Sequence, residues 1–137
     1  MVTKADLMFV REFEYRQRER ERTLEKLREK VDVHSIQYDK IMVGGGEQRD
    51  RLAEHAAAVD AMEKRFAKET LEDKARYLRT VDEVMHLPTR EMEVIRLRYI
   101  EDHSWNWIRR KLHYERSHVF KIHANALRLL EHSTETD

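Results

Sequence analysis

Cysteine is absent from this chain, proline occurs once, and the three glycines stand next to one another. Without cysteine the protein forms no disulfide, no Cys-type zinc finger and no thiol nucleophile, which is compatible with a reducing cytoplasm. Few helix breakers and 39% charged residues favour long helices over sheets. No run of about 18 apolar residues occurs, and the N-terminus has no apolar core typical of a signal peptide, so we expect no membrane partner.

The first forty residues show apolar positions at alternating spacings of three and four, which is a coiled-coil register. The positions in this register are Val10, Phe13, Gln17, Arg20, Leu24, Leu27, Val31, His34, Tyr38 and Ile41. Because Gln17 and Arg20 are polar, we expect that part of the helix to be only partly paired or to project beyond its partner.

A glycine break at residues 43–46 separates this helix from a second one, expected from Glu47 to Met85. One apolar face of the second helix contains Leu52, Val59, Met62 and Phe66. The face is expected to continue in a shifted phase through Leu71, Ala75, Leu78, Val81 and Met85. Two helices of similar length joined by a tight loop indicate an antiparallel hairpin. One two-helix seam buries too little surface to be stable alone, so residues 1–86 are expected to oligomerise or bind a partner.

Leu87-Pro88 marks the start of a second domain, residues 87–132, because proline begins helices well and disfavours helical angles in the residue before it. Three helices are expected there, at Thr89–Ile100, Trp105–Leu112 and Arg116–Glu131, with Ser104 as the N-cap of the second. The last two helices form a helix-turn-helix, which places one helix in the major groove of DNA. The inward positions are Met92, Ile95, Leu97, Tyr99, Ile100, Trp105, Ile108, Leu112, Val119, Ile122, Ala126, Leu127 and Leu130.

The predicted fold class is therefore all-α: a long antiparallel, coiled-coil-like helical hairpin, followed by a three-helix domain with a helix-turn-helix. Residues 133–137 are expected to form a disordered tail.

Charge is unevenly distributed, although the chain is neutral overall. Residues 103–128 contain six Lys and Arg and one acid, Glu115, which leaves a local charge of +5. A basic face can simply be solvated, but here it coincides with the expected helices and turn, which favours contact with double-stranded DNA. The residues expected to contact phosphates are Arg109, Arg110 and Lys111, and those expected to face the bases are Arg116, Ser117, His118, Lys121 and Asn125.

The same segment resembles region 4 of bacterial sigma-70-type factors, which reads the −35 promoter element. The resemblance lies in Leu87-Pro88, Glu91, the run 94–99 (VIRLRY), Ser104, Ile108, Leu112, Val119, Ile122, Ala126-Leu127 and Leu130. It implies DNA contact at Arg116, Ser117, His118 and Lys121. Two positions depart from the family: Phe120 replaces a residue that is often polar, and His113 replaces the usual turn glycine, which predicts backbone strain or a different turn.

The whole chain resembles phage-encoded transcriptional regulators of the RinA/ArpU kind, which join a charged helical half to a sigma region 4-like end. In the first half the similarity lies in residues 44–66, GGGEQRDRLAEHAAAVDAMEKRF. This resemblance implies control of phage late or packaging genes in the cytoplasm of a bacterial host, on DNA. The first half is too polar for the strand-opening part of a complete sigma factor.

No catalytic constellation is present, so we expect no enzyme, no cofactor and no metal site. His113, His118 and His123 are five residues apart, a spacing that spreads them around a helix. The leading hypothesis is a sequence-specific DNA-binding regulator that forms a homodimer through its N-terminal helices, or contacts bacterial RNA polymerase. The alternatives are a phage small terminase subunit, which recognises packaging DNA as a ring, and a protein that only binds host RNA polymerase.

Overall fold

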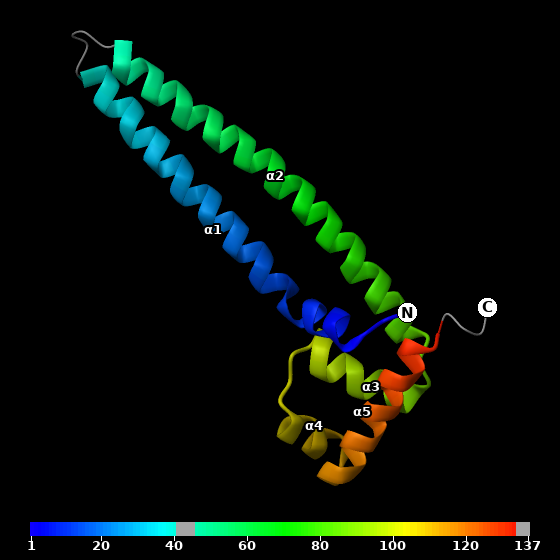
Figure 1. The fold of residues 1–137 in the computed structure, drawn as a ribbon. Helices are drawn as coiled ribbons and strands as arrows, with labels where there is room; N and C mark the ends of the chain where they lie inside the picture. Colours follow the sequence, from blue (N-terminus) through cyan, green and yellow to red (C-terminus); the bar gives the residue numbers. More distant parts are fainter. Residues whose placement is uncertain (41–45, 134–137) are drawn as a thin grey trace. The chain divides into compact units, whose positions relative to one another are not determined.

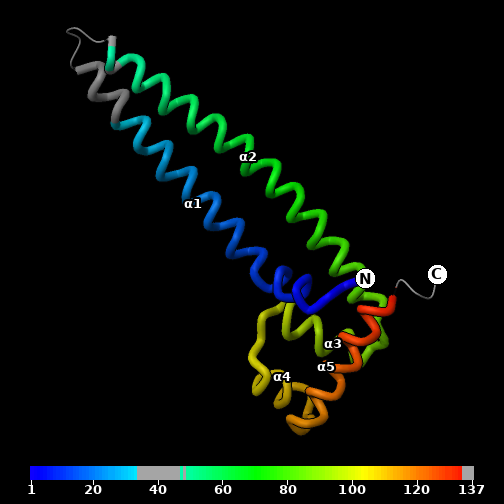
Figure 2. Tube along the Cα trace, in the orientation of Figure 1, coloured from blue at the N-terminus to red at the C-terminus, as the bar shows by residue number. Residues whose placement is uncertain are grey.

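The computed structural model describes residues 1–40 and 46–133, with side chains from 1–33, 47 and 49–133. The described part consists of α1 (Lys4–Lys40), α2 (Gly46–Met85), α3 (Thr89–Ile95), a π-helical turn (Arg96–Ile100), α4 (Trp105–Leu112) and α5 (Arg116–Glu131) (Figure 1). No strand occurs among these residues, so the predicted all-α class is confirmed. The predicted glycine break at 43–46, apart from Gly46 at the start of α2, and residues 134–137 of the predicted tail lie outside the described residues (Figure 2).

The chain forms two compact units, Met1–Glu14 with Asp73–Asp137, and Tyr15–Glu72. The first unit therefore contains more than the predicted domain 87–132, because it also holds the start of α1 and the end of α2. Each unit is described by itself below.

In the unit Tyr15–Glu72, α1 and α2 lie side by side and antiparallel. Arg28 pairs with Glu63 at 3.0 Å, whereas Arg20 pairs with Glu69 at 3.5 Å, so residue numbers rise along one helix as they fall along the other. The half-buried apolar side chains between the two helices are Leu24, Leu27, Val31, Leu52, Val59, Met62 and Phe66. These are positions at which the sequence showed helical periodicity.

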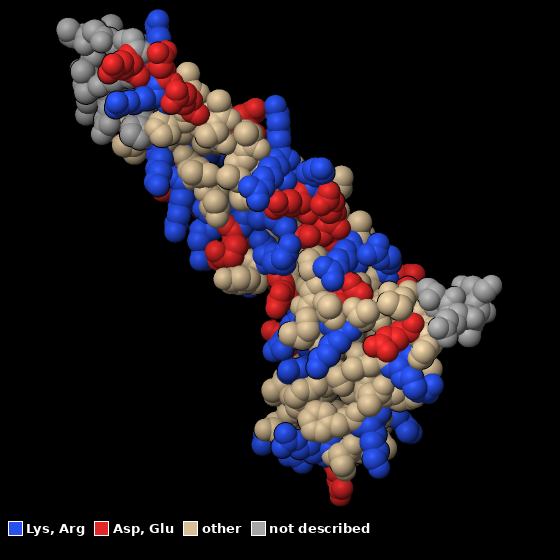
Figure 3. Space-filling view, in the orientation of Figure 1, with Lys and Arg blue, Asp and Glu red and all other residues tan. Residues whose placement is uncertain are grey.

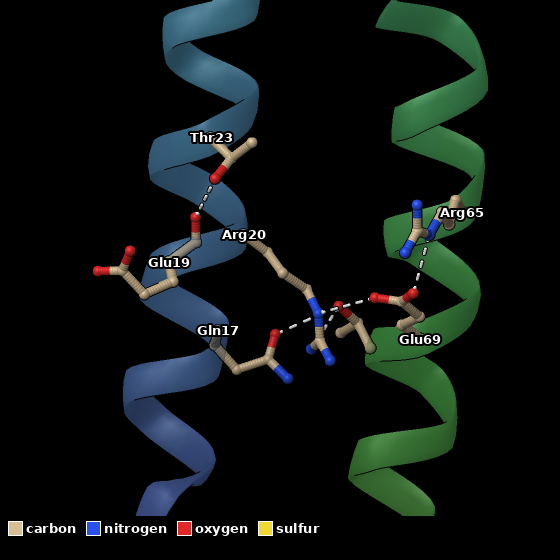
Figure 4. A network of polar contacts seen from close by, with 7 residues as sticks. Gln17, Glu19, Arg20, Thr23, Arg65 and Glu69 are labelled. Atoms are coloured by element: carbon tan, nitrogen blue, oxygen red, sulfur yellow. Dashed lines mark hydrogen bonds and ion pairs between the residues drawn. The ribbon is translucent and has the colours of Figure 1, made fainter.

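A polar cluster occupies part of this two-helix interface (Figure 4). The Thr70 hydroxyl donates to Gln17 Oε1 at 3.3 Å, and Arg20 donates to Thr70 Oγ1 at 3.5 Å. The Glu69 carboxylate forms ion pairs with both Arg20 and Arg65. The other amide atom of Gln17, Nε2, is buried without a hydrogen-bond partner. The stretch around Gln17 and Arg20 therefore does not project beyond its partner helix, but contacts α2 through polar groups.

The other unit has a core to which both ends of the chain contribute. Val2, Leu7 and Val84 pack with Ile95, Tyr99, Ala126 and Leu130, all of them buried. The backbone N–H of Val2 also donates to Leu130 O at 3.1 Å. The chain's first residues thus cover the C-terminal helices.

Local capping chemistry holds this N-terminal segment in place. Thr3 and Asp6 exchange hydrogen bonds, from Thr3 N–H to Asp6 Oδ2 at 3.0 Å and from Asp6 N–H to Thr3 Oγ1 at 3.4 Å. Burial alone would raise the pKa of Asp6, but the Thr3 N–H and the Arg76 guanidinium 2.9 Å away hold that pKa below its ordinary value. The spacing Thr3-x-x-Asp6 thus acts as a capping box at the start of α1.

A second core group joins α3, the π-helical turn, α4 and α5. Its buried members are Val94, Leu97, Ile108, Val119 and Ile122, and Trp105, Leu112 and Tyr114 pack against them. The inward faces predicted for the last three helices are confirmed, and α5 packs against both α3 and α4. The apolar positions expected at the end of α2 are mostly uncovered in the described residues, however: Leu71, Leu78 and Met85 are 71%, 65% and 52% exposed and Val81 is half-buried. Thr80 and Val84 provide the buried side of the helix near its end.

Candidate nucleic-acid interface

Two local devices define the start and the end of α4. The Ser104 hydroxyl accepts the Trp107 N–H at 3.1 Å, so the predicted N-cap is confirmed. After α4, the backbone of His113 adopts left-handed angles, with φ 58° and ψ 41°. Its N–H donates a hydrogen bond to Arg109 O. This is the position and conformation that favour glycine after a helix. Of the two predicted alternatives, strain or a different turn, the left-handed angles favour strain at His113. The left-handed turn directs the chain from α4 into α5.

The connection between α3 and α4 differs from the predicted single helix Thr89–Ile100. The chain is α-helical to Ile95 and then makes a π-helical turn, closed by Glu101 N–H to Arg96 O at 2.9 Å. Such turns commonly bend helices at functional sites. Asp102 follows at φ 59°, and its carboxylate pairs with Arg11.

Aromatic rings connect α4 with the start of α5. The Trp105 and Phe120 rings meet edge to face, with centroids 5.3 Å apart. Phe120 is 36% exposed, and the Arg116 guanidinium lies 5.4 Å above its ring. The Arg98 guanidinium lies 4.7 Å from the centre of the Trp105 ring and donates to His103 O at 3.0 Å. The unusual Phe120 therefore forms an exposed apolar spot that also positions Arg116.

Five cations on α4 and α5 have no acidic partner among the described residues. Arg110, Lys111, Arg116 and Lys121 are exposed and Arg109 is half-buried. None of the five makes an ion pair or a side-chain hydrogen bond with the described residues. In the face drawn in Figure 3, Lys and Arg side chains border the surface formed by α4 and α5, and acidic side chains are few there. A polyanion is therefore attracted to this surface.

The predicted site residues do not all share this surface. Ser117 and Lys121 are exposed on the side of α5 opposite Val119 and Ile122, and Phe120 is exposed beside them. His118 is instead half-buried, with its ring 4.6 Å from that of Tyr114.

Asn125 was also predicted to face the bases, but both the nitrogen and the oxygen of its side-chain amide form hydrogen bonds within the protein. It donates to Glu91 Oε1 at 3.0 Å and accepts from Arg128 at 2.6 Å. Asn125 thus connects α5 to α3.

His123 is part of the core and not of the basic surface. Its Nε2 lies 2.7 Å from the Tyr99 hydroxyl, and its ring stands edge-on to Trp105. Burial, followed by the nearby charges of Lys4 and Arg98, lowers the pKa of His123 to about 4, so the ring is neutral at pH 7. Burial also raises the pKa of Tyr99.

Sequence reasoning missed the aromatic and polar supports of this surface. Arg116 and Phe120 are four residues apart, a spacing that places them on the same side of a helix and could have indicated their contact. The contact of Arg98 with Trp105 depends on the π-helical turn, which has no sequence signal in this chain.

No family model, curated protein or solved structure matches this chain. Among residues 1–40 and 46–133, no helix is long and apolar enough to cross a bilayer. Within the same ranges, no three His, Asp or Glu side chains are grouped so that they could hold a metal ion.

Proposed function

We propose that the protein is a sequence-specific DNA-binding regulator that reads double-stranded DNA with α5 of a sigma region 4-like helix-turn-helix. The observation that carries the proposal is the group of five cations on α4 and α5 without acidic partners, next to a tight turn that joins two short packed helices. In a helix-turn-helix the second helix lies in the major groove and the first crosses the backbone. α5 and α4 correspond to these two helices.

Under this proposal, residues of α5 face the bases and residues of α4 face the phosphates. Ser117 and Lys121 supply a hydroxyl and an ammonium that can reach base edges. Phe120 supplies an apolar edge of the kind that contacts a thymine methyl group. Arg109, Arg110 and Lys111 are at the end of α4, where cations suit the phosphate backbone. Arg116, held over the Phe120 ring, is ordered before DNA arrives.

The biological role that we propose follows from the sequence resemblance to phage regulators of the RinA/ArpU kind. It is the control of phage late or packaging genes in a bacterial cytoplasm. A dimer formed through the N-terminal helices would present two α5 helices to a two-fold symmetric site. Bacterial RNA polymerase is a second partner in this proposal.

The proposal is tested by the salt dependence of binding to a labelled duplex, measured by fluorescence anisotropy. Each lost phosphate contact makes the slope of log K against log salt shallower by about 0.9. We expect Arg116→Ala with Lys121→Ala to weaken binding at least about 100-fold and to make the slope shallower by one to two contacts.

A matched control separates this surface from the general basicity of the chain. Arg49 and Arg51 are exposed cations on α2, likewise without an ion pair or hydrogen bond to the described residues. Arg49→Ala with Arg51→Ala removes the same charge and should leave both affinity and slope unchanged. Equal losses from the two double variants would overturn the proposal. A solution mass of eight or more chains would favour a terminase-like ring instead.

A further inference from the structure

The exposed side of α5 combines polar and apolar side chains. Ser117, Phe120, Lys121 and Ala124 are exposed there, and each lies three or four residues from two of the others, which places all four on one side of the helix. Phe120 and Ala124 are apolar, and Phe120 is 36% exposed. Two of the four side chains therefore offer a base neither a hydrogen-bond donor nor an acceptor.

The side chains that recognise adenine or cytosine by hydrogen bonds are scarce on the described α5. Asn and Gln suit adenine, and Asp and Glu accept from the cytosine amino group. The amide of Asn125 already bonds Glu91 and Arg128. The acids Glu115 and Glu131 lie just before the helix and at its last residue. The exposed middle of α5 thus offers more to an apolar group than to these two bases.

Thymine supplies that apolar group. Its C5-methyl is the apolar group that a base edge presents in the major groove of unmodified DNA, and Phe and Ala are among the side chains that contact it. Arg116 and Lys121, which flank Phe120 in sequence, are cations without an ion pair to the described residues, so the apolar spot lies where a polyanion is attracted. An apolar group carried by a polyanion fits this combination.

The positions of the two apolar residues suit neighbouring base pairs. The Phe120 ring is held by the edge of Trp105, with centroids 5.3 Å apart, and by the Arg116 guanidinium 5.4 Å from its centroid. Its ordering therefore costs little on binding. Ala124 follows four residues later, about 6 Å along the helix axis. Successive base pairs are about 3.4 Å apart, so thymines one or two steps apart match this distance.

We propose that α5 selects thymine by its methyl group, through Phe120 and Ala124, in two A·T base pairs one or two steps apart. The inference rests on the proposed function and names the base that this part of α5 recognises. It assigns a specificity role to Phe120, the residue that departs from the sigma region 4 pattern.

Deoxyuridine is a direct probe, because it pairs with adenine as thymidine does and lacks only the methyl group. The duplex is one selected by the full chain from a random pool, resynthesised with deoxyuridine at one thymine at a time. At two positions we expect the Kd to rise about fourfold, the effect of one apolar carbon removed from water. Phe120→Ala should reduce this ratio to about one at the first position, and Ala124→Gly should do so at the second.

Two further variants separate a methyl contact from general weakening. Lys121→Ala should weaken binding to every duplex but keep both fourfold ratios, because it removes a charge and no apolar surface. Phe120→Leu should keep a ratio of at least about twofold, because leucine is still apolar. Each ratio is taken within one variant, so a change in stability affects both duplexes equally, and circular dichroism checks the helix content.

The outcomes distinguish this inference from the proposed function. A pool that does not converge on a site counts against reading of DNA by α5. A converged site at which deoxyuridine has no effect on the native chain overturns the methyl contact alone. The same holds if Phe120→Ala and Ala124→Gly leave both ratios at fourfold.

Discussion

Protonation of His123 should destabilise the unit that contains it. The pKa of His123 is about 4 in the folded protein against an ordinary 6.5, because the ring is buried beside Tyr99 and Trp105. The unfolded chain thus takes up a proton at higher pH than the folded chain. Stability is therefore full above pH 6.5 and is lost as the pH falls from 6.5 toward 4.

The size of the effect follows from the shift in pKa. One pKa unit corresponds to about 1.4 kcal/mol, so the full difference would be about 3 kcal/mol. Because the ring is only partly buried, solvent screening reduces this, and we expect a loss of about 2 kcal/mol between pH 7 and pH 4. The variant His123→Gln keeps a hydrogen-bonding partner for the Tyr99 hydroxyl but cannot be protonated in this range.

Urea unfolding followed by tryptophan fluorescence is a suitable assay, since both tryptophans, Trp105 and Trp107, lie in the same unit as His123. The free energy of unfolding should fall more steeply with acid for the native chain than for His123→Gln. His118→Gln, at a half-buried position beside Tyr114, serves as the control and should follow the native curve. Parallel curves for the native chain and His123→Gln would refute the assignment of the low pKa.

Two further substitutions test local strain and polar burial. His113→Gly should raise the free energy of unfolding by about 1 kcal/mol in the same assay, because glycine adopts the left-handed angles of this turn without the cost borne by a residue with a Cβ; His113→Ala should give no gain, and an equal gain from both would contradict the strain. Gln17→Met should raise the free energy of unfolding, measured from the urea-induced loss of helix by circular dichroism, by about 1 kcal/mol, because it removes a buried amide nitrogen without a partner. A lower free energy of unfolding would show that the Gln17 bond to Thr70 outweighs that nitrogen.

Local signals account for what the sequence predicted well. The helix starts at Thr89, Trp105 and Arg116, the Ser104 cap and the inward faces follow from capping chemistry and a 3.6-residue period, which act within a few residues. The strained turn at His113 was equally local, since it depended on one missing glycine.

The features that sequence reasoning missed depend on contacts between distant parts of the chain. Nothing near Val2 indicates that it will pack under Leu130, and nothing near Asn125 indicates its bond to Glu91. The exposure of Leu71 and Leu78 could not be predicted, because periodicity shows that a helix has an apolar side but not what covers it. The positive charge of the basic surface was predicted from the sequence. The contact between the Arg116 guanidinium and the Phe120 ring is seen only in the structure.

The account's central claim is that α5 reads the sequence of double-stranded DNA. Its most direct test is a selection of duplexes bound by the purified full chain from a random pool, followed by measurement of Kd for the selected and for scrambled duplexes at the same salt concentration. The account predicts convergence on a defined site, bound at least about 1,000-fold more tightly than the scrambled duplex. A pool that stays random, with equal Kd values for both duplexes, would contradict it.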